Sequence, residues 1–174
     1  LKSLNFASKS LKISLNNYIN FINNPNPENT FAMCISANLA GKAISISKTT
    51  APHAVSYPFT SIFGISHGHA VSLSLGKFLK FNYKNMSYSN CNFNLKKRFS
   101  LIFKLTETTN INELIVFLNK IQNKANLESN FKKLNIDINK DLPKILEGIN
   151  EIRLKNNPIK LTINDVGNIL KNNN

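Results

Sequence analysis

Apolar residues recur along much of the chain at intervals of three, four and seven positions. Residues at these intervals share one face of an α-helix, so the pattern predicts amphipathic helices. The first apolar stripe consists of Leu4, Leu11, Leu15, Tyr18 and Ile22. No stretch alternates apolar and polar residues over the length of a strand. We therefore expect an all-α fold, a helical bundle without internal repeats.

Prolines separate the first two predicted helices. Pro25 and Pro27 end the first helix, and Pro27 with Glu28 suits the opening turn of the second. The second helix is expected to turn one stripe toward the core. That stripe consists of Phe31, Ile35, Leu39, Lys42, Ala43 and Ile46. Cys34 is also expected in the core, and both Cys34 and Cys91 are expected to be reduced, because they lack the spacing of a metal or redox pair.

A third helix should begin after Thr50, a good N-cap, with Pro52 in its first turn. We expect this helix to be short, because Pro58 should kink or end it before the turn at Gly64. A fourth helix should start near Ser66 and point six residues inward, namely Ala70, Val71, Ser74, Leu75, Phe78 and Leu79. Further helices are predicted at 95–105, 111–125, 141–154 and 162–171.

Composition narrows the class of protein. With 174 residues, 42% of them hydrophobic, the chain can form one domain, which we place at 1–174. The net charge of +13 would favour a nucleic-acid partner, but only Arg98 and Arg153 are arginines and the lysines are scattered among Asn and Ile. These residue types share A/T-rich codons, so we expect no nucleic-acid partner, and we interpret the basic run NLKKRFSLIFK as a solvated helix face. No apolar run is long enough for a membrane span, so we expect no membrane association and a cytoplasmic location.

All three histidines of the sequence lie between residues 51 and 70. His53 falls in the first turn of the third helix with Tyr57 four residues later on the same face, and His67 opens the fourth helix. Two helix starts joined by a tight loop can bring both imidazoles to one point, where they would suit a divalent metal ion. Ordinary surface or capping histidines remain the alternative. His69 points to another side of its helix and is expected to play a structural or supporting role.

Two segments carry a family resemblance. NLAGKAISISKTTAPHAVSYPFTSIFGISHGHAVSLSLGKFLKFN and the terminal INEIRLKNNPIKLTINDVGNIL resemble the C-terminal helical domain of the iron-containing (group III) alcohol dehydrogenase family. The fourteen-residue step from His53 to His67 is that family's spacing between its last two metal ligands. The resemblance implies that His53 and His67 bind a divalent metal, Fe²⁺ first and Zn²⁺ second, in an enzyme that uses NAD(H) or NADP(H). Tyr57 stands where many members have a further His facing the substrate, which makes it a candidate catalytic residue, with simple packing as the alternative.

The family also has features that this sequence lacks. Its other two metal ligands are an Asp and a His on an earlier helix, and no histidine precedes His53. The six glycines form no phosphate-binding loop of the kind found in its nucleotide-binding α/β domain. We therefore expect a domain truncated on its N-terminal side and inactive in isolation. The implied partner is a small alcohol or aldehyde, with self-association into a homo-oligomer left open.

Within the family, the segment GKAISISKTTAPHAVSYPFTSIFGISHGHAVSL is most similar to members that reduce phosphonoacetaldehyde. Lys48, Thr49 and Thr50, at the amino end of the His53 helix, would suit the anionic group of such a substrate, since they combine a cation, hydroxyls and unpaired N–H groups. The alternative for these three residues is an N-cap beside an exposed lysine. The alternative for the whole chain is a non-catalytic helical fragment or binding module.

Overall fold

Helices make up nearly all of the regular structure. The computed structural model describes residues 2–172, and within that range the chain forms nine α-helices, one 3₁₀ turn and no strand. The elements are α1 (Lys2–Asn23), α2 (Pro27–Ser47), α3 (Ala51–Phe63), α4 (His67–Lys84), η1 (Met86–Tyr88), α5 (Leu95–Thr106), α6 (Ile111–Lys124), α7 (Ile138–Glu147), α8 (Glu151–Leu154) and α9 (Ile163–Lys171). The predicted all-α fold is confirmed. No helix in this range is both long and apolar enough to cross a membrane.

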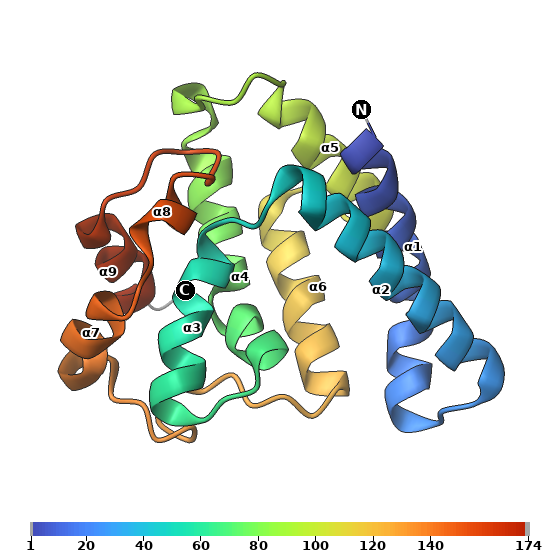
Figure 1. The fold of residues 1–174 in the computed structure, drawn as a ribbon, viewed down its shortest axis with the longest axis horizontal. Helices are drawn as coiled ribbons and strands as arrows, with labels where there is room; N and C mark the ends of the chain where they lie inside the picture. The colour runs from blue at the N-terminus through green and yellow to red at the C-terminus, as the bar shows by residue number, and fades with distance from the viewer. Residues whose placement is uncertain (1, 173–174) are drawn as a thin grey trace.

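The described chain divides into a helical body and a projecting hairpin. In Figure 1, α3 and α4 lie at the centre with α7, α8 and α9 on one side, and the α1–α2 hairpin stands away on the other. The larger apolar core joins α3 and α4 to α7 and α9, around the fully buried residues Val55, Phe59, Phe78 and Ile145. A second core joins α5 and α6 through Phe99 and Leu114. The hairpin meets the body mainly where α1 packs on α5.

The predicted inward stripe of α2 is wrong for four of its six residues, whereas Ala43 is buried as expected and Leu39 is half-buried. Phe31, Ile35 and Ile46 are 68%, 39% and 53% exposed, whereas Ser36 is 2% exposed. Ser10 and Ser36 each donate a hydroxyl hydrogen bond to the other's carbonyl oxygen, at 2.8 and 2.9 Å. Small side chains let two helices approach closely, so serines occupy the interface and the larger apolar residues are left on the outer face. Cys34 is exposed on this helix, which corrects its expected place in the core.

Pro58 does not end α3, which was one of the two outcomes predicted for it. The helix continues to Phe63 and ends at Gly64, which adopts a left-handed conformation with φ of 68°. A proline inside a helix removes one backbone hydrogen bond. Here Pro58 is fully buried, and it packs so closely on Gly148 that a Cβ atom added there would lie 2.9 Å from the Pro58 Cβ. Burial of the whole helix face offsets the lost hydrogen bond.

The predicted helix at 141–154 is two helices. Asp137 accepts hydrogen bonds from the backbone N–H groups of Asn139 and Lys140, which starts α7 three residues earlier than expected. The chain leaves the helix at Gly148, and the Asn150 side chain then caps α8. In α4, Ala70, Ser74 and Phe78 are buried as predicted, and the other three residues of the expected stripe are half-buried.

Candidate metal centre

The two candidate ligand histidines sit at the starts of neighbouring helices. α3 begins with the buried residues Ala51 and Pro52, and the His53 N–H donates to the Thr50 carbonyl oxygen at 3.0 Å. α4 begins at His67 itself, three residues after the turn at Gly64. α3 and α4 pack along each other over the larger core. From the start of α4, the His67 side chain contacts residues of the first half of α3, namely His53 and Ser56.

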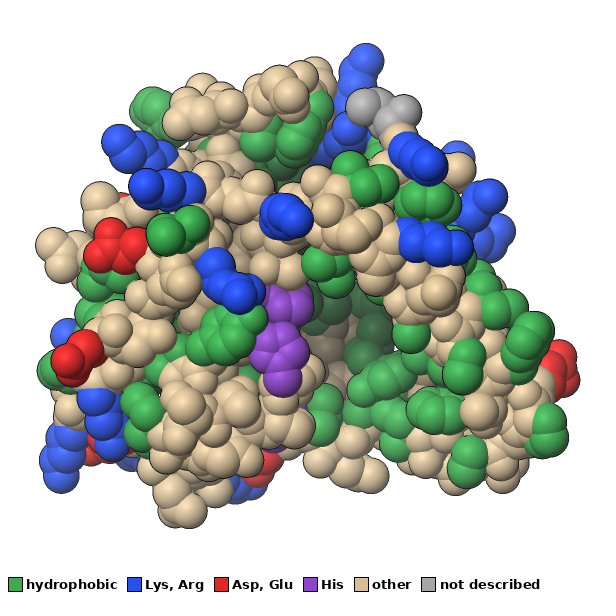
Figure 2. All heavy atoms as spheres, in the orientation of Figure 1, with side chains coloured by type: hydrophobic (Ala, Val, Ile, Leu, Met, Phe, Trp, Pro, Cys, Tyr) green, Lys and Arg blue, Asp and Glu red, His purple; other side chains and the backbone are tan. Residues whose placement is uncertain are grey.

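The structure brings His53 and His67 together. The His53 Nδ1 atom lies 3.2 Å from the His67 Nε2 atom, and the ring centroids are 5.2 Å apart. His53 is half-buried and His67 is exposed. Figure 2 shows the histidine side chains at the surface, at the edge of a hollow beside the α1–α2 hairpin. The convergence expected from the two helix starts is present.

Ser56 orients the His67 ring. Its hydroxyl donates to the His53 carbonyl oxygen at 2.8 Å, and its oxygen also lies 3.2 Å from the His67 Nδ1 atom. Since the hydroxyl has only one proton, Nδ1 must carry the hydrogen in the second contact. A neutral imidazole protonated at Nδ1 has its lone pair on Nε2, the nitrogen that faces His53. Ligating histidines are commonly held by such a hydrogen bond from the other ring nitrogen.

The pair fits two positions of a metal site. Two nitrogens that bind one tetrahedral ion at ~2.1 Å lie roughly 3.4 Å apart, close to the observed 3.2 Å. Burial is the main cause that lowers the pKa of His53 below its ordinary value, and repulsion from a protonated His67 and from Arg153 lowers it further. A lowered pKa favours the neutral form that binds metal. Among residues 2–172, however, no three His, Cys, Asp or Glu side chains gather in a metal-binding group. The described residues thus offer two ligands.

Replacing Ser56 by alanine should weaken metal binding without unfolding the protein. The His67 ring would lose the hydrogen bond that fixes its Nδ1–H tautomer, and we expect the Zn²⁺ concentration for half-saturation to rise about 10-fold or more. Zinc titration followed through the histidine ring resonances measures this. The matched control is Ser72→Ala, because Ser72 makes the same bond to the carbonyl oxygen of His69, three residues earlier, on the other helix. Equal effects of the two substitutions would contradict the role of Ser56.

Tyr57 and Arg153 extend the site. The Tyr57 ring centroid is 5.7 Å from that of His67, and its hydroxyl accepts a 2.6 Å hydrogen bond from the Arg153 guanidinium. The guanidinium carbon also lies 4.6 Å from the centre of the Tyr57 ring. Sequence reasoning missed Arg153, which comes from α8 and lies 96 positions from Tyr57 along the chain. The one available signal is that Arg153 is an arginine in a chain whose cations are nearly all lysines.

Lys48, Thr49 and Thr50 lie in the linker between α2 and α3. The Lys48 ammonium group donates to the Ser45 carbonyl oxygen at 3.4 Å, so it points back along α2. Asn156 donates to the Ser47 and Thr49 carbonyl oxygens at 2.9 and 2.8 Å, which ties this linker to the segment after α8. Thr50 is the N-cap residue of α3, but its side chain makes no capping hydrogen bond.

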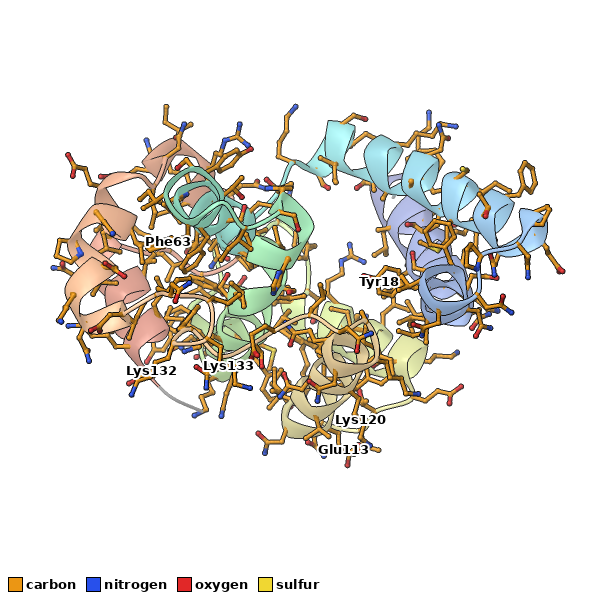
Figure 3. All side chains as sticks on the ribbon, turned by 90° about the horizontal axis from the view of Figure 1, so that it is seen from below. Tyr18, Phe63, Glu113, Lys120, Lys132 and Lys133 are labelled. Carbon is orange, nitrogen blue, oxygen red and sulfur yellow. The ribbon has the colours of Figure 1, made fainter. Side chains whose placement is uncertain are left out.

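His69 is separate from the histidine pair. Its Nε2 atom lies 2.7 Å from the Glu128 carbonyl oxygen, in the loop that follows α6. His69 also borders a cavity of about 390 Å³ between α1, α4 and α6. Tyr18 closes the α1 side of this cavity, on the flank of the hairpin that faces the rest of the molecule (Figure 3). On the wall of this cavity, the Gln122 amide donates a hydrogen bond to the Ser72 hydroxyl at 2.9 Å.

Residues 5–174 match the Fe-containing alcohol dehydrogenase family, C-terminal. The chain belongs to this family. Solved structures agree with its helical domain: an archaeal halo-thermophilic Red Sea brine pool alcohol dehydrogenase gives a TM-score of 0.85 at 18% identity, over 97% of this chain and 44% of that one. Sulfoacetaldehyde reductase from Bifidobacterium kashiwanohense gives a TM-score of 0.80 at 21% identity, over 98% of this chain and 43% of that one. These likenesses establish the fold of an Fe-containing alcohol dehydrogenase C-terminal domain.

A partial relative supports the expected subgroup. Phosphonoacetaldehyde reductase from Streptomyces viridochromogenes is 37% identical over 59 residues, which is 34% of this chain and 15% of that protein. The resemblance to both the Fe-containing alcohol dehydrogenases and this reductase is therefore confirmed. The chain spans less than half the length of each of these relatives.

The two family-like segments of the Fe-containing alcohol dehydrogenase domain meet inside the body. Asn82, near the end of α4, and Asn157, just before Pro158, are both buried and exchange amide hydrogen bonds of 2.8 and 3.3 Å. Asn157 also donates to the Ile159 carbonyl oxygen at 2.8 Å. This contact anchors the segment after Arg153 to the helix that begins with His67.

Proposed function

We propose that this chain is the metal-binding helical part of a metal-dependent, NAD(P)-linked alcohol dehydrogenase or aldehyde reductase. His53 and His67 would be two of the metal ligands, with Fe²⁺ as the first candidate and Zn²⁺ as the second. The observation that carries the proposal is the 3.2 Å distance between His53 Nδ1 and His67 Nε2. The remaining ligands and the site for NAD(H) or NADP(H) would come from a nucleotide-binding part outside these 174 residues.

When bound, the metal ion polarises the oxygen of the aldehyde or alcohol while the nicotinamide exchanges hydride with its carbon. Within this chain, Tyr57 is the proposed hydrogen-bond donor to that oxygen. Arg153 already donates to one lone pair of the phenol oxygen, so the phenol's own O–H remains available as a donor. A substitution Tyr57→Phe would remove this donor and keep the ring's packing.

The proposed substrate is a small phosphonate aldehyde. Its support is the partial match to phosphonoacetaldehyde reductase, together with the cations around the histidine pair. Lys48, Thr49 and Thr50 remain candidates for the anionic group, although the Lys48 ammonium group lies against the end of α2. Thr50, whose side chain makes no capping bond, is the member of the three best placed to reach a ligand at the start of α3.

Zinc titration of the 174-residue chain tests the metal-binding part of this proposal. We expect weak binding, because two imidazoles supply half of a four-ligand site, with changes at the His53 and His67 ring resonances and little change at His69. His53→Ala and His67→Ala should each abolish the binding, and His69→Ala, the matched control, should retain it. The isolated chain should reduce no aldehyde with either nicotinamide cofactor. Zinc binding that survives loss of both His53 and His67 would refute the assignment.

A further inference from the structure

The Tyr57 ring contacts both Arg153 and His67 of the histidine pair. The Arg153 guanidinium stacks 4.6 Å from the centre of the Tyr57 ring, and that ring lies 5.7 Å from the ring of His67. Figure 2 shows Lys or Arg side chains directly beside the histidines on the exposed face. Arg153 is exposed, so its guanidinium can be reached by a ligand that occupies the site.

The charge of Arg153 is not neutralised within the described part of the chain. The ion pairs found between residues 2 and 172 use Lys133, Lys140 and Lys144, and none includes Arg153. Its one hydrogen-bonded side-chain partner is the neutral phenol of Tyr57. A guanidinium has five N–H donors in a planar fork, and four of them remain for a ligand. No carboxylate of the described residues lies within ion-pair distance of Arg153, so its positive charge is available to an anion.

The position of Arg153 is fixed by its neighbours. Asn156 hydrogen-bonds to the carbonyl oxygens of Ser47 and Thr49, just before α3, and Asn157 pairs with Asn82 of α4. The short helix that carries Arg153 is therefore attached to both helices that carry the histidines. Tyr57 holds the guanidinium itself by the ring contact and by the 2.6 Å hydrogen bond. A preorganised guanidinium loses little freedom when it binds a ligand.

We propose that Arg153 binds the anionic group of the substrate, a tetrahedral oxyanion such as a phosphonate or sulfonate at the far end of a short aldehyde. Its planar fork can donate two parallel hydrogen bonds to such a group. The aldehyde end would then lie toward His53, His67 and Tyr57. This inference rests on the proposed function, and it assigns selection for charged substrates to Arg153 on α8, whereas Lys48 points back along α2.

The sequence offers an unusually clean test. Since Arg98 and Arg153 are the only arginines, a chain labelled with ¹⁵N-arginine gives two Nε–H resonances. Arg98 is a matched control, because it also stacks on an aromatic ring, 4.9 Å from the centre of Phe93, but on α5. We would titrate the 174-residue chain with ethylphosphonate, with ethanesulfonate and with neutral propionamide. We expect both anions to shift the Arg153 resonance, the amide to leave it in place, and Arg98 to respond weakly to all three.

Substitution gives a second readout. Arg153→Gln should raise the dissociation constant for ethylphosphonate about 10-fold, and Arg98→Gln should leave it unchanged. Arg153→Lys keeps the charge but loses the planar fork of N–H donors, so its dissociation constant for ethylphosphonate should lie between those of the other two variants. Circular dichroism checks that each variant is folded.

A stronger response to ethylphosphonate than to ethanesulfonate assigns a phosphonate substrate, and the reverse order assigns a sulfonate. Equal responses of Arg98 and Arg153, or unchanged affinity in folded Arg153→Gln, would overturn the inference. Zinc titration of the same sample separates the two proposals, because failure of zinc to reach His53 and His67 counts against the proposed function alone.

Discussion

Replacing His67 by alanine in a complete enzyme that carries this chain should remove the bound metal and lower kcat by at least about 100-fold. The His67 Nε2 atom lies 3.2 Å from the His53 Nδ1 atom, and Ser56 contacts the other nitrogen of the His67 ring. Without it, at most three protein ligands remain for a divalent ion that must also keep a position open for substrate. Metal analysis of the purified variant and steady-state kinetics with an aldehyde measure the two effects, and His53→Ala should behave in the same way.

His69→Ala is the control for that experiment. The two histidines are two positions apart on one helix, but His69 contacts the Glu128 carbonyl oxygen and not the other rings. We expect His69→Ala to retain its metal and to lose much less activity. An enzyme whose metal content and rate survive His67→Ala would show that the metal centre lies elsewhere.

Replacing Phe59 by alanine should destabilise the 174-residue chain by about 3–5 kcal/mol. Phe59 is fully buried on α3, between His53 and the turn at Gly64, and its ring packs 5.6 Å from that of Phe131 and 6.3 Å from that of Phe63. Truncation would leave a cavity in the larger core. Urea unfolding followed by circular dichroism gives the free energy of unfolding, which for a domain is typically only ~5–15 kcal/mol in total.

Phe31→Ala provides the comparison, since Phe31 is 68% exposed on α2. Its removal should change the free energy of unfolding by less than about 0.5 kcal/mol. If Phe59→Ala and Phe31→Ala had similar effects, the core around α3 and α4 would be assigned wrongly.

Local patterns predicted most of the fold. The apolar intervals, the caps and the turn at Gly64 act between residues a few positions apart, so they indicated where most helices begin and end. The side of α2 that faces the hairpin partner could not be found in this way. Its interface consists of serines bonded to backbone carbonyl oxygens across 26 positions, and a hydrophobicity pattern assigns such residues to solvent. Pro58 was misjudged because its effect depends on the packing partner Gly148, far along the chain.

The candidate site also contains some residues that local sequence patterns predict and others that they do not. The positions of His53 and His67 followed from two helix starts and a fourteen-residue spacing. Ser56 follows a simple local rule, because it bonds to the carbonyl oxygen three residues earlier, but its contact with His67 exists only once α3 and α4 pack together. Arg153 reaches Tyr57 across 96 positions, and no local pattern encodes such a contact. The two residues meet only because α8 packs against α3.

The hairpin of α1 and α2 has a consequence for cooperativity. Its buried residues are Ser10, Asn29, Ser36 and Ala43, and it joins the body mainly through contact of α1 with α5. No residue of the hairpin belongs to either apolar core, so opening it leaves the core of α3, α4, α7 and α9 intact. Segments of this kind open at lower free energy than the whole domain. We therefore expect two cooperative units of unequal stability in this chain, with the histidine pair in the more stable one.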